Sequence, residues 1–301
     1  MPFLERGVGE IILWSLKNGF PHNNLLKGVY FMPDMPVRLI ATDIDGTLLN
    51  ERGELTERTR RAIRRAREKG IVVAIATGRF PENAYLLLED YGLRLPIIGI
   101  NGARIVDENL NLLSERVMAP ESARRVLDAL TAIGSDFFIF ADHAISAGTK
   151  EGVHHSELSQ GDRVRALGFR YYHGKEEAYS VLERDVYKFF VRDNQPLDRV
   201  REALGGIPGI ALTQSYYNNI EVMPDGIDKG KGVAELARLL GITMDQVMTL
   251  GDESNDIPML RAAGYGVAMG NGSEEAKRAA RFVTDTNAND GFAKAIEQYA
   301  L

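Results

Sequence analysis

The stretch LIATDIDGTLLN (39–50) begins as an uninterrupted apolar strand and then places Asp43 and Asp45 one residue apart, ahead of Gly46 and Thr47. Two carboxylates this close repel each other and are costly to desolvate. A turn with Gly46 at positive φ is the purely structural interpretation. The acidic pair at the end of a buried strand favours a functional site if other parts of the chain supply matching groups.

The composition is that of a globular protein. The chain has 301 residues, of which 45% are hydrophobic and 26% are charged, and its formal net charge is -6. This length suits one large domain or two smaller ones. An acidic chain has no general attraction to nucleic acid or to an anionic membrane, so we expect neither as a partner.

The absence of cysteine narrows the possible chemistry. Disulfides, zinc–thiolate sites and cysteine nucleophiles are excluded, and a cytoplasmic location fits. No stretch approaches the roughly 20 apolar residues of a membrane-spanning helix. The segment EIILWSL near the N-terminus lacks the flanks of a signal peptide.

Residues 1–34 differ from the rest of the chain, because they are turn-rich and show no strong period. We expect an N-terminal extension here. The alternative is that translation starts at Met32 or Met35.

Strands and helices alternate after this extension. Apolar runs predict buried strands at 37–42, 71–76, 247–250 and 265–269. Thr56 is a typical cap for a helix that ends before Gly70, and Val233, Leu236, Ala237 and Leu240 follow a helical period that Gly241 closes. The stretch 95–106 reads as a strand, an Asn-Gly turn and a strand. This alternation predicts an α/β fold with a doubly wound, Rossmann-like parallel sheet.

The middle of the chain follows another pattern. Residues 118–217 read as a helix after Pro120, the strand FFIFA, the strand YKFFVR, a helix after Pro196 and the strand IALTQ. This α+β insert is long enough to be a domain of its own. We therefore expect a core built from residues 35–117 and 218–301, with a cap domain over 118–217.

Four polar clusters fall at strand ends or helix starts. They are the DIDGT segment at 43–47, the TGR segment at 77–79, Lys229 in PDGIDKGKG, and the GDESND segment at 251–256. Ligands of an open parallel sheet bind outside the carboxyl ends of its strands. We therefore expect the four clusters to meet at one edge.

These groups suit a phosphate dianion and a hard cation. The carboxylates of Asp43 and Asp252 are ligands that Mg²⁺ prefers. Phosphate oxygens would be bound by four further groups, namely the Thr77 hydroxyl, the Gly78 amide, Lys229 and Asn255. Asp43 would attack phosphorus as a nucleophile, and Asp45 would protonate the leaving alcohol and then activate water.

The ordered motifs DxDGT, TGR, Lys and GDxxND resemble those of the haloacid dehalogenase-like (HAD) phosphatase superfamily. The insert between the second and third motifs looks like the type IIB cap, and the phrases INGARI, MPDGIDKGKGV and GDESNDIPML look like the Cof-type subfamily. The resemblance covers the chain from Met35 to its C-terminus.

The resemblance implies a Mg²⁺-dependent phosphatase that acts on small phosphomonoesters, such as sugar phosphates or the phosphorylated cofactors pyridoxal phosphate and FMN. It implies further that the Ile44 backbone binds phosphate and that Asp45 binds the metal through its carbonyl. Asp256 would orient Lys229 or a metal-bound water. A monomer or a homodimer is expected.

Two other functions stay open. Related folds include phosphosugar mutases, which pass the phosphoryl group to a second sugar. A catalytically silent protein that binds a phosphorylated metabolite is the other alternative, although such a protein has no need of both Asp43 and Asp45.

Three features have more than one interpretation. His154 and His155 would contact substrate or, less readily because adjacent histidines chelate poorly, a second metal. Arg79 would reach substrate or form an ion pair. The basic helix ERTRRAIRRAREK suits a solvated face better than a nucleic-acid patch, since glutamates intersperse its arginines.

Overall fold

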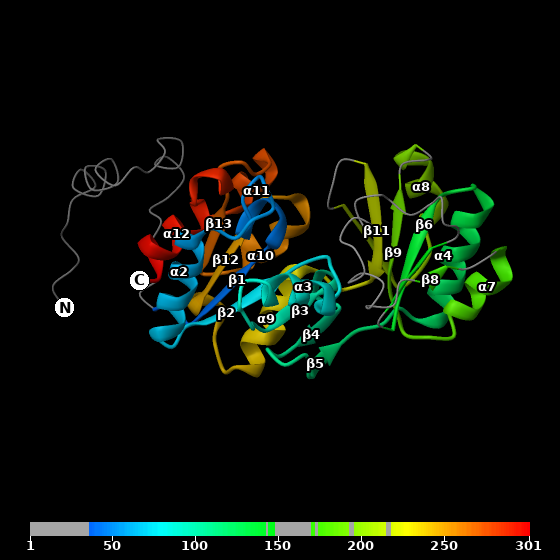
Figure 1. Ribbon diagram of the computed structural model, residues 1–301. Coiled ribbons are helices and arrows are strands. Elements are labelled where there is room, and N and C mark those ends of the chain that lie inside the picture. Colours follow the sequence, from blue (N-terminus) through cyan, green and yellow to red (C-terminus); the bar gives the residue numbers. More distant parts are fainter. Residues whose placement is uncertain (1–35, 143, 148–169, 172–173, 193–195, 215–217) are drawn as a thin grey trace. The chain divides into compact units, whose positions relative to one another are not determined.

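The computed structural model describes residues 36–142, 144–147, 170–171, 174–192, 196–214 and 218–301 (Figure 1). The N-terminal extension expected over residues 1–34 lies outside the described residues. So do His154 and His155, and the roles expected for them stay predictions.

An eight-stranded sheet carries the strands that were predicted on either side of the insert. Its strand order is β14-β13-β12-β1-β2-β3-β4-β5, and neighbours are parallel from β14 to β3 and antiparallel from β3 to β5. The strands are β1 (Leu39–Thr42), β2 (Val72–Ala76), β3 (Ile97–Gly99), β4 (Arg104–Val106), β5 (Leu112–Glu115), β12 (Val247–Gly251), β13 (Tyr265–Ala268) and β14 (Phe282–Val283).

Helices cover both faces of this sheet. Leu39 and Ala41 of β1 pack in one cluster with Val233 and Leu236, whereas Ile40 points to the other face and is equally buried. The helices are α2 (Glu57–Glu68), α3 (Pro81–Glu89), α9 (Lys229–Leu239), α10 (Ile257–Ala262), α11 (Glu274–Ala279) and α12 (Gly291–Tyr299), with α2 and α12 in contact (Figure 1). The prediction of a doubly wound α/β fold is confirmed.

The insert forms a second sheet of six strands in the order β10-β11-β9-β6-β7-β8. Its apolar core contains Val126, Leu127, Ile139 and Phe189. The strands are β6 (Phe137–Ala141), β7 (Ala144–Ala147), β8 (Arg170–Tyr171), β9 (Val186–Arg192), β10 (Ile210–Thr213) and β11 (Asn219–Pro224), and the helices are α4 (Pro120–Ala132), α7 (Gly174–Val181) and α8 (Leu197–Leu204).

The strand β11 departs from the predicted boundary. The sequence pattern predicts a return to the core at residue 218, but β11 pairs with β9 and β10 in the sheet of the insert. The segment NNIEVMP carries polar residues next to apolar ones, and all six residues of the strand, which pairs with β9 on one side and β10 on the other, are buried. In sheet membership the insert therefore extends to Pro224.

The end of α9 also differs from its prediction. The helical period put Leu240 on the apolar face, but Leu240 is the C-cap residue and is 39% exposed. Gly241 then takes a positive φ of 65°, and Ile242 packs into the cluster instead. A hydrophobic contact made just past a glycine cap is a common way to end a helix.

The registers of the sheet bring the motif-bearing strand ends together. Thr42 of β1 lies opposite Ile75 of β2 and Leu250 of β12, so the three parallel strands end at one edge. The amide of Asp43 donates to the carbonyl of Leu250 at 3.0 Å, which extends this pairing into the DIDGT turn.

Thr56 caps α2 as predicted and also reaches a second helix. Its Oγ1 accepts from the Thr59 amide at 3.2 Å and donates to Asp290 Oδ1 at 2.6 Å, at the start of α12. We predict that Thr56→Ala lowers the free energy of unfolding in urea by about 1–2 kcal/mol, because an N-cap and an interhelical bond are lost. Thr56→Ser, which keeps the hydroxyl, should stay near wild type. Equal stability of the two variants would contradict this account.

Candidate active site

A buried lysine lies between two aspartates at the centre of the strand-end edge. Lys229 is the first residue of α9, and its Nζ is 2.6 Å from Asp43 Oδ1 and 2.6 Å from Asp256 Oδ1. Lys229 is almost fully buried and so is Asp256. The structure therefore joins three of the four predicted clusters through a single ammonium group.

Asp256 also holds the GDESND segment, to which it belongs, in place. Its Oδ2 accepts from the backbone amides of Asp252 at 2.9 Å and of Glu253 at 3.1 Å. Both oxygens of Asp256 are thus engaged, one by Lys229 and the other by the turn that carries Asp252. This geometry is the one that the expected role of Asp256 in orienting Lys229 requires.

The carboxylates of the site strongly affect one another. Burial alone lowers the pKa of Lys229, but the charges of Asp256 and Asp43 and their hydrogen bonds raise it above its ordinary value. Burial raises the pKa of Asp43 well above its usual range, against the lowering effect of Lys229. Burial and then the charge of Asp256 raise the pKa of Asp252 to about 7. The single positive charge of Lys229 cannot neutralise three buried carboxylates. A further cation would therefore lower the pKa values of both Asp43 and Asp252.

The donor set fits a hard cation. One oxygen each of Asp43, Asp252 and Asp256 lie within 4.8 Å of one another. Lys229 engages Asp43 Oδ1, and the Thr47 hydroxyl donates to Asp252 Oδ1 at 2.7 Å. Within the described part of the chain, Asp43 Oδ2 and Asp252 Oδ2 accept no hydrogen bond. These two oxygens are the ones left for a metal ion, and carboxylate oxygen is the ligand type that Mg²⁺ prefers.

The absence of a side chain at Gly46 leaves space beside the Asp252 carboxylate. Gly46 has a φ of 78°, and a Cβ built on it would lie 2.2 Å from Asp252 Oδ2. Only glycine combines this backbone conformation with such a close approach. The carbonyl of Gly46 also accepts from Asn271 Nδ2 at 2.9 Å, which holds the turn from the other side.

Asp45 does not join the carboxylate cluster. Its side chain is 62% exposed and pairs with Arg79 through two contacts, Nη2 to Oδ1 at 2.7 Å and Nε to Oδ2 at 3.0 Å. Of the two interpretations given for Arg79, the structure contains the ion pair. The close repulsion first expected between Asp43 and Asp45 is replaced by a stronger one among Asp43, Asp252 and Asp256, because successive side chains of the turn point in different directions.

The remaining predicted residues surround this centre. Thr77 is buried at the end of β2, with its amide bonded to the Ile98 carbonyl at 2.9 Å, and the side chain of Ile44 is fully buried beneath the DIDGT turn. Gly78 is next to Asn101, whose Oδ1 would lie 3.2 Å from a Cβ built on the glycine. Asn255 Nδ2 donates to the same Asn101 Oδ1 at 3.4 Å.

Sequence reasoning missed Asn101 and Thr47 as parts of this site. Thr47 belongs to the DxDGT motif, and Asn101 belongs to the Asn-Gly turn that follows β3, with a positive φ of 52°. The place of Asn101 directly after a buried strand was an available signal, since that strand ends at the same edge. Lys188 and Glu221 of the insert, which also contact this edge, had no such signal.

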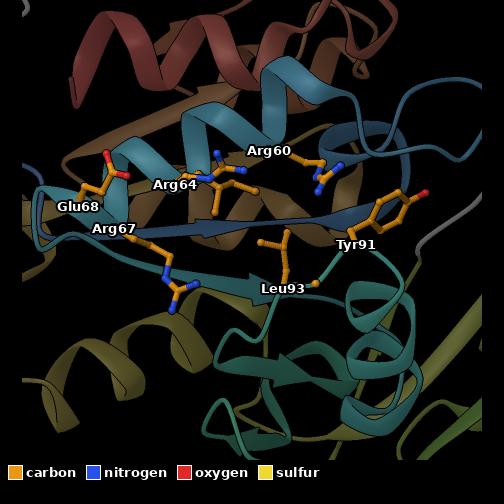
Figure 2. Close-up of a pocket in the computed structure, with 8 residues that line it drawn as sticks. Arg60, Arg64, Arg67, Glu68, Tyr91 and Leu93 are labelled. Carbon is orange, nitrogen blue, oxygen red and sulfur yellow. The ribbon is translucent and has the colours of Figure 1, made fainter.

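A separate pocket of about 550 Å³ is formed by α2 and the turn before β3 (Figure 2). Figure 2 shows Arg60, Arg64 and Arg67 beside Tyr91 and Leu93, and none of the lining residues belongs to the four motifs.

Two arginines of α2 are paired with acids. Arg60 pairs with Glu57 at 3.3 Å, and Arg58 pairs with Glu297 at 2.7 Å. The solvated-face interpretation of this helix stays a prediction.

Among the described helices, none is both long and apolar enough to cross a membrane.

The contact between Gly46 and Asp252 allows a matched test. We predict that Gly46→Ala weakens Mg²⁺ binding about tenfold or more, measured by calorimetry, because the new methyl group displaces Asp252. Gly53→Ala is the control, since Gly53 has a φ of 72° with nothing within 4 Å of its built Cβ. Both variants should lose about 1 kcal/mol of stability from backbone strain. Equal Mg²⁺ affinities would argue against a cation at Asp252.

Comparisons with known proteins agree with this geometry. The family model for haloacid dehalogenase-like hydrolases matches residues 40–296. The Bacillus subtilis (strain 168) protein 5-amino-6-(5-phospho-D-ribitylamino)uracil phosphatase YcsE is 33% identical over 270 residues, which cover 89% of this chain and 98% of that protein. A second phosphatase of the same name and organism, YwtE, is 32% identical over 282 residues, covering 87% of this chain and 98% of the relative.

Solved structures give the same result. A haloacid dehalogenase-like hydrolase from B. subtilis superposes with a TM-score of 0.77 at 28% identity, covering 87% of this chain and 99% of the other. A sugar phosphatase of HAD subclass IIB superposes with a TM-score of 0.76 at 26% identity, with coverages of 87% and 99%. The chain therefore belongs to the haloacid dehalogenase-like hydrolase family and is an enzyme of its phosphatase class, as the four motifs predicted.

Proposed function

We propose that this protein hydrolyses small phosphomonoesters with the help of Mg²⁺, through an aspartyl-phosphate on Asp43. The observation that carries the proposal is the ammonium of Lys229, 2.6 Å from both Asp43 and Asp256, beside two carboxylate oxygens that suit a cation. A nucleophilic carboxylate can approach a phosphate dianion only where fixed positive charge offsets their repulsion. Lys229 and a bound cation would supply that charge.

In the first step, a carboxylate oxygen of Asp43 bonds to phosphorus and the bond from phosphorus to the ester oxygen breaks. Asp45 gives its proton to the departing oxygen, so that an alcohol leaves. Arg79 holds the Asp45 carboxylate before substrate binds, through contacts of 2.7 and 3.0 Å. That pair has to open, and the Asp45 carboxylate has to take up a proton from solvent, before Asp45 can protonate the leaving group.

In the second step, the oxygen of a water molecule bonds to phosphorus and the bond between phosphorus and Asp43 breaks. Asp45, now ionised, takes a proton from that water. Inorganic phosphate leaves, and both aspartates return to their starting states.

The phosphoryl oxygens would be bound by groups around Asp43. We assign this role to the Ile44 backbone, the Thr77 hydroxyl, the Gly78 amide, Lys229 and Asn255. Asp43 and Asp252 would hold Mg²⁺ through their side chains and Asp45 through its carbonyl, with Asp256 in support. When bound, the ion offsets the negative charge that gathers on the phosphoryl oxygens during transfer.

The two sheets support a division into catalytic core and cap. In this proposal the eight-stranded sheet carries the chemistry, and the insert, with β11 added to it, covers the leaving group and selects the substrate. Sugar phosphates and the phosphorylated cofactors pyridoxal phosphate and FMN are candidate substrates. The names of YcsE and YwtE add 5-amino-6-(5-phospho-D-ribitylamino)uracil to the set.

The test is phosphate release from a panel of these compounds, with Mg²⁺ and with EDTA. We predict Mg²⁺-dependent release that Asp43→Asn abolishes, because an amide is not a nucleophile toward phosphorus. Asp198→Asn, an exposed position of α8 in the insert, is the matched control and should keep full activity. Release that survives in Asp43→Asn would rule out Asp43 as the nucleophile.

The same experiment separates the two alternatives. A phosphosugar mutase would yield an isomerised sugar phosphate without free phosphate. A silent binding protein would take up phosphorylated compounds and Mg²⁺ without any product.

A further inference from the structure

A buried ion pair of the insert touches the phosphate-binding edge of the core. Lys188 of β9 and Glu221 of β11 lie 3.3 Å apart, and each side chain is only 3% exposed. The rings of Phe140 and Phe190 flank the ammonium, with centroids 4.3 and 5.7 Å from Nζ. Removing two charges from water is expensive, and the mutual attraction of a buried pair often does no more than offset that expense. A contribution to stability alone therefore does not account for this buried pair.

One line of contacts runs from Lys188 to Thr77. Lys188 Nζ donates to the carbonyl of Gly78 at 2.9 Å, and the amide of the same peptide unit, that of Arg79, donates to Thr77 Oγ1 at 3.2 Å. Lys188 thus fixes the plane of this peptide. Because the Thr77 oxygen already accepts a hydrogen bond from the amide, its hydroxyl proton is left to donate to a phosphate oxygen.

A second line runs from Glu221 to Asn255. Glu221 Oε2 accepts from Asn101 Nδ2, which turns Asn101 Oδ1 toward Asn255. Asn255 Nδ2 donates to this oxygen at 3.4 Å and retains a second N–H for a ligand. Asn101 also ties the two lines together, since its backbone amide donates to the Thr77 carbonyl at 2.9 Å.

We propose that Lys188 and Glu221 are positioning residues of the phosphate site, one holding Thr77 and the other holding Asn255. This inference rests on the proposed function, in which those two residues bind the phosphoryl group. Because Lys188 and Glu221 belong to the insert, the phosphate site would be complete only while the insert contacts the core. By linkage, a bound phosphoryl group then stabilises that contact to the same extent.

Apolar contacts already join the insert to the core around the pair. Phe80, Ile100 and Ala103 of the core pack with residues of the insert such as Phe140 and Met223. Phe140 of this cluster also lies against the Lys188 ammonium, with its ring centroid 4.3 Å from Nζ. Apolar side chains of similar length at both positions would keep these contacts while removing the charges, which makes the role of the ion pair testable.

The test compares wild type with the double variant Lys188→Met/Glu221→Met, which replaces the pair by apolar side chains of similar length. The dissociation constant of inorganic phosphate with Mg²⁺ present is measured by calorimetry, together with KM, kcat and urea stability. We expect wild-type stability or higher, because apolar replacements of buried pairs are often tolerated. The dissociation constant and KM should rise about tenfold or more, since two phosphate ligands lose their orientation, while kcat changes less.

Controls keep the inference falsifiable. Lys277→Met, at a partly exposed i,i+3 pair of α11, should leave the phosphate dissociation constant, KM and kcat unchanged. Lys188→Leu/Glu221→Leu, which also removes both contacts without leaving a buried charge, serves if the Met variant does not fold, with the same expected rise. Unchanged phosphate affinity in a folded variant, with or without a loss of stability, would overturn the proposal. Substrate turnover by wild type tests the proposed function separately, because phosphate binding is measured without turnover.

Discussion

The two 2.6 Å contacts from Lys229 Nζ to Asp43 and Asp256 are the interaction on which the rest of the site depends. They tie the start of α9 to the ends of β1 and β12, and they place positive charge inside a cluster of buried carboxylates. Taking one partner away from a buried pair costs several kcal/mol, because the other charge is left uncompensated. The position of Asp252 follows from the same interaction, since Asp256 holds the amide of Asp252 with its second oxygen.

The two aspartates of the proposed chemistry lie in different electrostatic surroundings. Asp43 belongs to the buried cluster, whereas Asp45 lies at an exposed rim with Arg79. A nucleophile benefits from a dry, charged surrounding, while a residue that exchanges protons with a leaving group and with water benefits from access to both. The insert adds a third layer, because its buried pair Lys188–Glu221 contacts the turn that carries Thr77 and Gly78. The cap is in this view part of the phosphate site as well as its cover.

Much of this arrangement could be predicted from the sequence, because parallel strands force their ends to one edge. The places of Asp43, Thr77 and Asp252 follow from three apolar runs and that topological rule. The direction of the Asp45 side chain did not follow, since it depends on the dihedrals of a single turn. Lys188 and Glu221 stand in ordinary strand patterns, and only tertiary contacts reveal that they meet the core. The return of β11 to the sheet of the insert was missed for the same reason, because the ladder and not the local pattern decides which sheet a short strand joins.

The most direct test of the account is to trap the phosphoryl group on the protein. The Asp45→Asn variant is incubated with Mg²⁺ and 4-nitrophenyl phosphate, whose leaving group needs no proton, and is then quenched in acid and digested for mass spectrometry. The first step should proceed and the second should stall without its base, so we predict a phosphorylated peptide that contains Asp43. Release of nitrophenol without any phosphorylated peptide, or phosphate on another residue, would contradict a covalent mechanism at Asp43.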